Sequence, residues 1–259
     1  MSTPLHRLRS ALAAQAELGL QVVPHRWLSL AEAAARRATA PPPAAPAPSP
    51  AGANDALAGH GDTPHSGVPT LEALAAIAAG CTRCGLAASR TQVVFGTGSP
   101  SAQLMVIGEA PGADEDRAGE PFVGPAGKLL TAILAAIGLR REDVYIANVL
   151  KCRPPGNRNP APEEVAACRP FLERQIELIA PELILTLGTF AAHLVLDTEA
   201  PIGALRGRFH QHHGIAVLPT YHPAYLLRNP QAKRPVWEDA KQVGRRLGLP
   251  EPFPGERGS

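Results

Sequence analysis

This sequence of 259 residues has a low net charge and lacks long apolar runs, and aromatic residues make up only 4% of it. The formal net charge is +2, so a polyanionic partner would have to meet a local basic patch rather than an overall positive chain. No stretch approaches the roughly 18 consecutive apolar residues of a membrane-spanning helix, and the N-terminus lacks a secretory signal. We therefore expect a cytoplasmic protein with no membrane partner.

Cysteine is also rare, with four residues in the whole chain: Cys81, Cys84, Cys152 and Cys168. In a reducing compartment such cysteines are metal ligands or buried free thiols more often than disulfides. Cys81 and Cys84 form a C-x-x-C pair, whereas Cys152 and Cys168 are widely spaced. Four thiolates fit either zinc or an iron–sulfur cluster, and the wide second pair somewhat favours the cluster. From spacing alone, a metal site and buried free cysteines are equally good interpretations.

Alanine and proline dominate residues 39–53 and give them almost nothing to bury. We expect residues 1–69 to be a largely disordered tail, with weak helical stretches followed by an extended linker. The folded domain is expected over residues 70–250 and a short C-terminal tail over 251–259. The tail suggests tethering to an unknown protein partner, and the domain itself is expected to be a monomer.

Predicted strands and helices alternate through the folded domain. Strands are expected at 103–108, 144–149 and 183–187, with a hairpin formed by 208–212 and 215–219; helices are expected at 126–137, 162–179, 189–196 and 234–247. This alternation predicts an α/β fold, a three-layer sandwich with a central, mostly parallel four-stranded sheet flanked by helices. Ligands of such folds bind at the carboxyl ends of the strands.

Two segments at these strand ends suggest a binding site. The stretch VIGEAPGADED resembles a phosphate-binding turn, but its four carboxylates, Glu109 among them, would repel phosphate. Phe122 lies in an irregular Gly/Pro-rich segment, where it could stack on a planar ligand or plug the core beneath the loop. Asn148 ends a strand, where its amide could read a ligand edge or cap the next turn.

His222 directly follows the last strand and precedes a proline. It could donate to an anion developing in the site, although a lone histidine is usually structural. Leu226, Leu227 and Arg228 form an apolar tip followed by a cation, which could wedge into a base stack or pack as an ordinary loop. Arginines around this segment and around KCRPPGNRNP could bind nucleic-acid phosphates or could be solvated.

Three motifs, GEAPGADEDRAGEPFVGPAG, IANVLKCRPPGNRNP and YHPAYLLRNP, together with the four cysteine positions, resemble the family 4 uracil-DNA glycosylases of bacteria and archaea. The resemblance covers residues 72–247, and the motifs occur in the order and spacing of that family. It implies removal of uracil from DNA by hydrolysis of the N-glycosidic bond, with uracil-containing DNA as the partner.

The resemblance also implies roles for individual residues. Four cysteines, Cys81, Cys84, Cys152 and Cys168, would hold a structural [4Fe-4S] cluster. Glu109, with the backbone of Ala110 and Pro111, would line the uracil site. Phe122 would stack on the base, Asn148 would read its edge, and His222 would face its O2. The Leu226–Arg228 segment would enter the duplex. Glu109 and His222 would thus be the catalytic pair.

A different class of function remains open from the sequence. The chain could be a catalytically weak iron–sulfur module that recognises uracil or single-stranded DNA within a repair or polymerase assembly. A nucleotide-binding α/β protein is disfavoured because of the acids in the glycine turn.

Overall fold

A computed structural model of the chain describes residues 65–251. The predictions made for residues 1–64 and 252–259 lie outside the described residues. Within this part, no helix is long and apolar enough to cross a membrane. The first helix starts close to where the sequence predicts folded structure: Thr70 caps α3 (Leu71–Ala79), accepting a hydrogen bond on Oγ1 from the backbone N–H of Ala73 over 3.2 Å.

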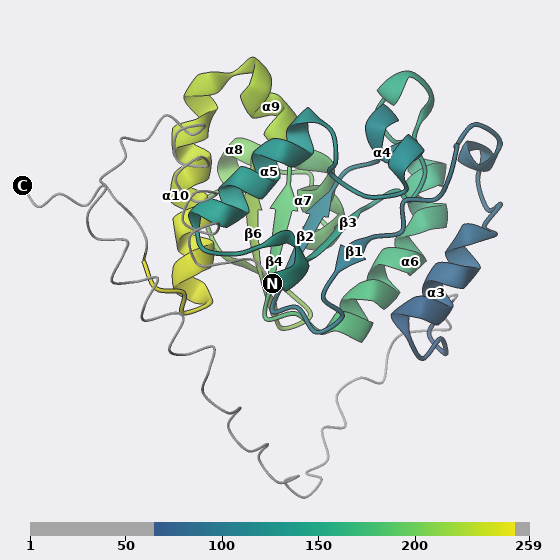
Figure 1. Cartoon of the computed structure of the whole chain (residues 1–259), viewed down its shortest axis with the longest axis horizontal. Helices are drawn as coiled ribbons and strands as arrows, with labels where there is room; N and C mark the ends of the chain where they lie inside the picture. Colours follow the sequence, from purple (N-terminus) through teal and green to yellow (C-terminus); the bar gives the residue numbers. More distant parts are fainter. Residues whose placement is uncertain (1–64, 252–259) are drawn as a thin grey trace, which may run out of the picture.

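A mixed sheet forms the centre of the molecule (Figure 1). Its strands are β1 (Thr97–Gly98), β2 (Leu104–Gly108), β3 (Tyr145–Asn148), β4 (Leu183–Leu187), β5 (His210–His212) and β6 (Ile215–Thr220). The order across the sheet is β1-β3-β2-β4-β6-β5, in which the four inner strands are parallel. The inner strands confirm the mostly parallel sheet, and β5–β6 confirms the hairpin.

The predicted number of strands, four, is wrong. The sheet has six strands because two short antiparallel strands flank the parallel ones. One of them, β1, is only two residues long and contains a glycine, so it has no hydrophobic alternation that the sequence could reveal.

Helices cover both faces of the sheet. They are α4 (Ala113–Ala118), α5 (Pro125–Ala136), α6 (Pro162–Ile179), α7 (Thr189–Leu196), α8 (Ile202–Leu205), α9 (Pro223–Arg228) and α10 (Lys233–Arg246). Short 3-10 turns are η1 (Gly85–Ala88), η2 (Arg141–Asp143), η3 (Pro155–Asn157) and η4 (Pro230–Ala232). The predicted bounds of α6 and α7 are confirmed, and those of α5 and α10 are shifted by one residue.

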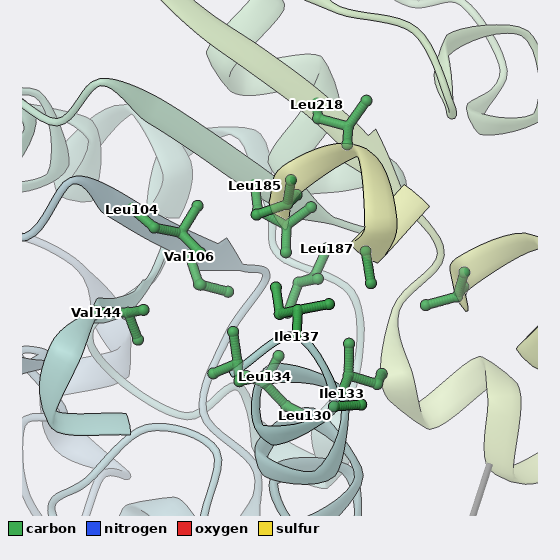
Figure 2. Packing of buried hydrophobic residues seen from close by; sticks show 14 of the residues in the cluster. Leu104, Val106, Leu130, Ile133, Leu134, Ile137, Val144, Leu185, Leu187 and Leu218 are labelled. Atoms are coloured by element: carbon green, nitrogen blue, oxygen red, sulfur yellow. The ribbon is translucent and has the colours of Figure 1, made fainter. Parts of the chain in front are cut away.

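The two faces of the sheet bury separate hydrophobic clusters. On one face, Leu130, Ile133 and Leu134 of α5 pack against alternate residues of the strands, such as Val106 and Leu185, as Figure 2 shows. On the other face, apolar residues of α6 and α7 pack against the intervening strand residues. Because β2 and β4 are buried along their whole length, their sequences are almost entirely apolar rather than alternating.

Candidate functional site

The strand order brings four loops to one edge of the sheet. The chain leaves β2 toward β3 on one side and later adds β4 and β6 on the other, so the connections reverse direction between β2 and β4. In doubly wound sheets, ligands bind at this point, outside the carboxyl ends of the strands. Glu109 follows β2, Asn148 ends β3, Gly188 follows β4, and His222 comes two residues after β6.

Glu109 differs from the other acids of the loop that follows β2. Asp114 pairs with Arg117, and Asp116 accepts hydrogen bonds from the Thr91 backbone N–H over 2.9 Å and the Thr91 hydroxyl over 2.7 Å. The Glu109 carboxylate makes no hydrogen bond or ion pair within residues 65–251. It is partly buried, and this burial raises its pKa. Ala110 and Pro111, the next two residues, are partly and fully buried.

Glu115 braces this loop against the segment that carries Phe122. Its Oε2 accepts from the backbone N–H of Gly112 over 3.1 Å, and its Oε1 accepts from Val123 over 3.0 Å and Gly124 over 2.9 Å. With both oxygens engaged by backbone donors, Glu115 holds two loops together. This role was not among the predictions from the sequence, although a glutamate three residues after the N-cap of α4 is a recognisable capping pattern.

Phe122 has a strained backbone. Its φ is +56°, in the left-handed region that costs a non-glycine residue about 1–2 kcal/mol. The ring is nevertheless buried. The Phe122 carbonyl lies against Gly127, where any Cβ would overlap it, and it accepts a hydrogen bond from Arg141 Nη1 over 3.0 Å. Neighbouring elements therefore hold Phe122 in a conformation that it would not adopt alone.

Asn148 and Phe122 meet over Gly108. A Cβ on Gly108 would overlap Asn148 Oδ1 and would stand 2.5 Å from Phe122 Cζ, so only glycine at the end of β2 allows both side chains to approach. Asn148 is 2% exposed, and in the described part of the chain its buried Oδ1 has no hydrogen-bond partner. An unpaired buried acceptor is costly, typically by about 1–3 kcal/mol, which makes it a good receptor for an N–H donor of a ligand.

His222 stands beside Phe122, with their ring centroids 5.6 Å apart. It caps α9: the backbone N–H of Ala224 donates to His222 Nδ1 over 3.1 Å. Burial, together with nearby Arg228, lowers the pKa of His222 to about 4. The ring is therefore neutral at physiological pH, with its proton on Nε2. Gly188 lies beneath it, since a Cβ there would stand 3.1 Å from His222 Cβ.

The apolar tip of the Leu226–Arg228 segment is smaller than the sequence predicts. Leu226 is fully buried in the cluster beneath α5, so it cannot wedge into DNA. The segment is a short helix, α9, rather than an open loop, and with about 3.6 residues per turn neighbouring side chains point in directions about 100° apart, so Leu226 and Leu227 do not share a face. Leu227 is 49% exposed and Tyr225 is 41% exposed, and Arg228 is exposed as well.

The KCRPPGNRNP loop holds itself in place. Arg158 forms a bidentate ion pair with the buried Glu164 of α6, at 2.9 Å and 2.5 Å, and Arg153 Nε donates to Asn157 Oδ1 over 2.8 Å. Hydrogen bonding to Arg158 lowers the pKa of Glu164. The guanidinium of Arg158 is thus engaged within the protein, which weakens the expectation that it contacts phosphate.

The four cysteines surround one pocket. Cys81, Cys84, Cys152 and Cys168 all line it, together with Arg83, Arg90 and Lys151. None of these cysteines forms a disulfide. Within residues 65–251, however, no group of three or more His, Cys, Asp or Glu side chains is placed to hold a metal ion.

Positive groups and N–H donors are directed at two of the thiols. The backbone N–H of Lys151 donates to Cys168 Sγ over 3.3 Å, and Arg90 Nη1 donates to Cys152 Sγ over 3.4 Å. Burial raises the pKa of the Cys152 thiol and that of Cys168, the latter to about 11. Without a metal these thiols would therefore stay protonated, whereas these donors and cations suit thiolate ligands of a negatively charged centre.

Lys151 also connects the cysteine pocket to the base of the site. It is 2% exposed, and its Nζ donates to the backbone carbonyl of Asn148 over 2.7 Å and to Gln175 Oε1 over 2.6 Å. Gln175 in turn donates to the Phe95 carbonyl over 2.9 Å and the Tyr145 hydroxyl over 3.2 Å. Such a satisfied buried network fixes the end of β3 in position.

The fold and these strand-end residues are those of one class of protein. Comparison of this chain with known sequences identifies that class. Residues 95–241 match the family description "Uracil DNA glycosylase superfamily". A type-4 uracil-DNA glycosylase of Archaeoglobus fulgidus is 47% identical over 180 residues, which cover 66% of this chain and 90% of the relative. Its counterpart in Thermotoga maritima is 48% identical over 167 residues, covering 63% and 87%, and that of Sulfurisphaera tokodaii is 44% identical over 172 residues, covering 63% and 78%.

Both the family match and the coverage of these relatives agree with the resemblance drawn from the three motifs. Within the uracil DNA glycosylase superfamily, the chain belongs to the type-4 uracil-DNA glycosylases.

Proposed function

We propose that the protein removes uracil from DNA by hydrolysing the N-glycosidic bond of deoxyuridine, the step that begins base excision repair. Family membership supports this function, and one structural observation carries it: the buried, unpartnered Oδ1 of Asn148 beside the Phe122 ring. This pair offers a hydrogen-bond acceptor and an apolar face, the two features that recognise the edge and the plane of a base.

Base recognition requires a flipped nucleotide, because the target atom is unreachable within a duplex. Phe122 would stack on the extruded uracil, a contact worth on the order of 1–3 kcal/mol. Asn148 Oδ1 would accept from uracil N3–H while its amide group donates to O4. Cytosine presents an acceptor at N3 and a donor at the 4-position, so both contacts would be mismatched.

Bond cleavage leaves negative charge on uracil and positive charge on the sugar. His222 Nε2–H would donate to O2 as that charge grows; the Ala224 N–H supports this role because it occupies Nδ1 and so fixes the tautomer. One such donor is typically worth about 3–4 kcal/mol in the transition state. Glu109, the acid of its loop that has no side-chain partner among residues 65–251, would stabilise the sugar cation or orient the attacking water.

DNA contacts would come from α9. Leu227, rather than the buried Leu226, would fill the space left by the flipped nucleotide, and Arg228 beside it would meet phosphate. The inserting segment is thus the one that the sequence predicts, but the inserting residue is Leu227.

We further propose that Cys81, Cys84, Cys152 and Cys168 hold a [4Fe-4S] cluster. Their shared pocket and its surrounding cations fit four thiolates, and a centre with several iron atoms spans a pocket that is not arranged around a single ion. Such a cluster would cross-link α6 to the segments before β1 and after β3. Base removal needs no chemistry from it.

A single assay tests the proposed function. The protein is incubated with a labelled single-stranded oligonucleotide that contains one deoxyuridine, and the product is treated with alkali to cut abasic sites. We expect cleavage at the uracil position and none in a matched cytosine oligonucleotide. Tight binding without cleavage would instead identify a uracil-recognition module with little or no activity.

A further inference from the structure

Arg141 lies outside the three motifs and contacts the segment that presents Phe122. It sits in η2, between α5 and β3, far from Phe122 in the sequence. Its guanidinium donates through Nη2 to the Pro121 carbonyl over 2.7 Å and through Nη1 to the Phe122 carbonyl over 3.0 Å. Two successive carbonyls are thus held by one rigid fork.

These contacts are made where the backbone most needs support. Phe122 has a φ of +56°, and both Pro121 and Phe122 are buried, so neither carbonyl could turn freely to water if Arg141 were absent. Thr131 completes the arrangement: its hydroxyl donates to the Gly127 carbonyl over 3.0 Å and lies 3.4 Å from Arg141 Nη1. The left-handed turn at Phe122 is therefore fixed from the α5 side.

Burial lowers the pKa of the Arg141 guanidinium, and the nearby carboxylates of Glu120 and Glu115 partly offset this effect. Glu115 itself binds the backbone N–H groups of Val123 and Gly124, directly after Phe122. Arg141 thus holds the carbonyls of Pro121 and Phe122, while Glu115 holds the N–H groups of the two residues that follow Phe122.

We infer that Arg141 is a positioning residue for base removal, which fixes the Phe122 ring at the distance from His222 and Asn148 that a stacked uracil requires. The inference rests on the proposed function, and it adds a specificity element that the motifs do not contain. Arg141 does not touch the base; it acts through the backbone of Phe122.

The adjacent residue provides a matched control. Arg140 is exposed and pairs with Asp143 and with Glu142, the latter at 2.7 Å, and it makes no hydrogen bond or ion pair with the Phe122 segment within the described residues. We expect Arg141→Met to lower the single-turnover rate of uracil release on the order of 10- to 100-fold, as misplacement of a substrate-binding group does. Arg140→Met should change the rate by less than about twofold.

A double-mutant cycle separates positioning from simple destabilisation. If Arg141 acts through Phe122, Arg141→Met combined with Phe122→Ala should be no slower than Phe122→Ala alone. If the rate loss of the double variant equals the product of the two single losses, the inference is overturned. An Arg141→Met rate equal to that of Arg140→Met would also overturn it. Arg141→Lys, which keeps the charge without the fork, should fall between wild type and Arg141→Met. Each rate is measured at a temperature where circular dichroism shows that the variant is folded.

A readout that does not depend on activity distinguishes this inference from the proposed function. The Phe122 and His222 rings are 5.6 Å apart, so the ring current of Phe122 shifts the His222 resonances in histidine-labelled protein. Arg141→Met should move these resonances and Arg140→Met should not. Resonances that Arg141→Met leaves in place would refute the inference even in an active enzyme. If Arg141→Met moves the resonances but the wild type releases no uracil, only the proposed function is refuted.

Discussion

The backbone N–H of Ala224 donates to Nδ1 of His222 over 3.1 Å, and this bond determines which ring nitrogen carries the proton. With a pKa of about 4, His222 should remain the neutral Nε2–H tautomer at pH 5.5. Nitrogen chemical shifts of labelled histidine measure this directly. A titration midpoint near the ordinary histidine value of about 6.5 would contradict the assignment.

The same lowered pKa makes stability depend on pH. Between about pH 6.5 and pH 4 the unfolded chain binds a proton at His222 and the folded chain does not, so stability is complete above this range and falls as the pH drops through it. From pH 7 to pH 4.5, this group should remove about 2–3 kcal/mol of the free energy of unfolding. Urea unfolding of wild type and His222→Asn at both pH values measures this loss of free energy. If stability depends equally on pH in the two proteins, His222 is not the cause.

Asn148→Asp tests the reading of the base edge. The variant replaces the donor of the amide with an acceptor, so uracil O4 would lose its partner while the 4-amino group of cytosine would gain one. We expect slower uracil release and measurable release of cytosine from a cytosine oligonucleotide. Unchanged discrimination between the two bases would show that Asn148 does not read this edge.

Glu109 and Asp114 form a matched pair of acids in one loop. Glu109→Ala should remove most base excision, by roughly 100-fold or more, while uracil-DNA binding measured by anisotropy is retained. Asp114→Ala removes a half-buried acid whose partner is the exposed Arg117, and it should leave the rate within about twofold of wild type. Full activity of the Glu109→Ala variant would rule out the proposed role of Glu109.

Leu226 and Leu227 are neighbours with opposite surroundings. Leu226→Ala leaves a cavity in the core and should lower the free energy of unfolding by about 2–5 kcal/mol. Leu227→Ala should leave stability almost unchanged and slow uracil release from double-stranded DNA more than from single-stranded DNA. A Leu227→Ala variant that is equally active on both substrates would argue against insertion by this residue.

The cysteine pocket predicts a coloured protein. Anaerobically purified wild type should be brown, with broad absorbance near about 400 nm and close to four irons per chain. Cys168→Ser should lose iron and stability together, because Cys168 lies on α6 and the other cysteines lie on separate segments. A colourless wild type with stoichiometric zinc would exclude the cluster.

The sequence predicts the parallel core and the principal site residues because both follow from local patterns. Apolar runs such as 183–187 mark buried strands, and the residues after them must lie at one edge of the sheet. It does not predict that Leu226 is buried, because a six-residue helix leaves too little periodicity to identify its inner face. Nor does it reveal Arg141, whose partners are main-chain carbonyls from a distant loop, since backbone acceptors carry no sequence signal.

Gly108 ends the β2 strand and carries no functional group, yet a single methyl group there would occupy the space in which Asn148 and Phe122 meet. Saturation mutagenesis should therefore find this position as intolerant of change as the residues that would contact the base. Substitution at Gly108 would remove activity without removing any reacting group. Engineering of a different base preference should begin from Asn148 and Phe122 and leave this glycine unchanged.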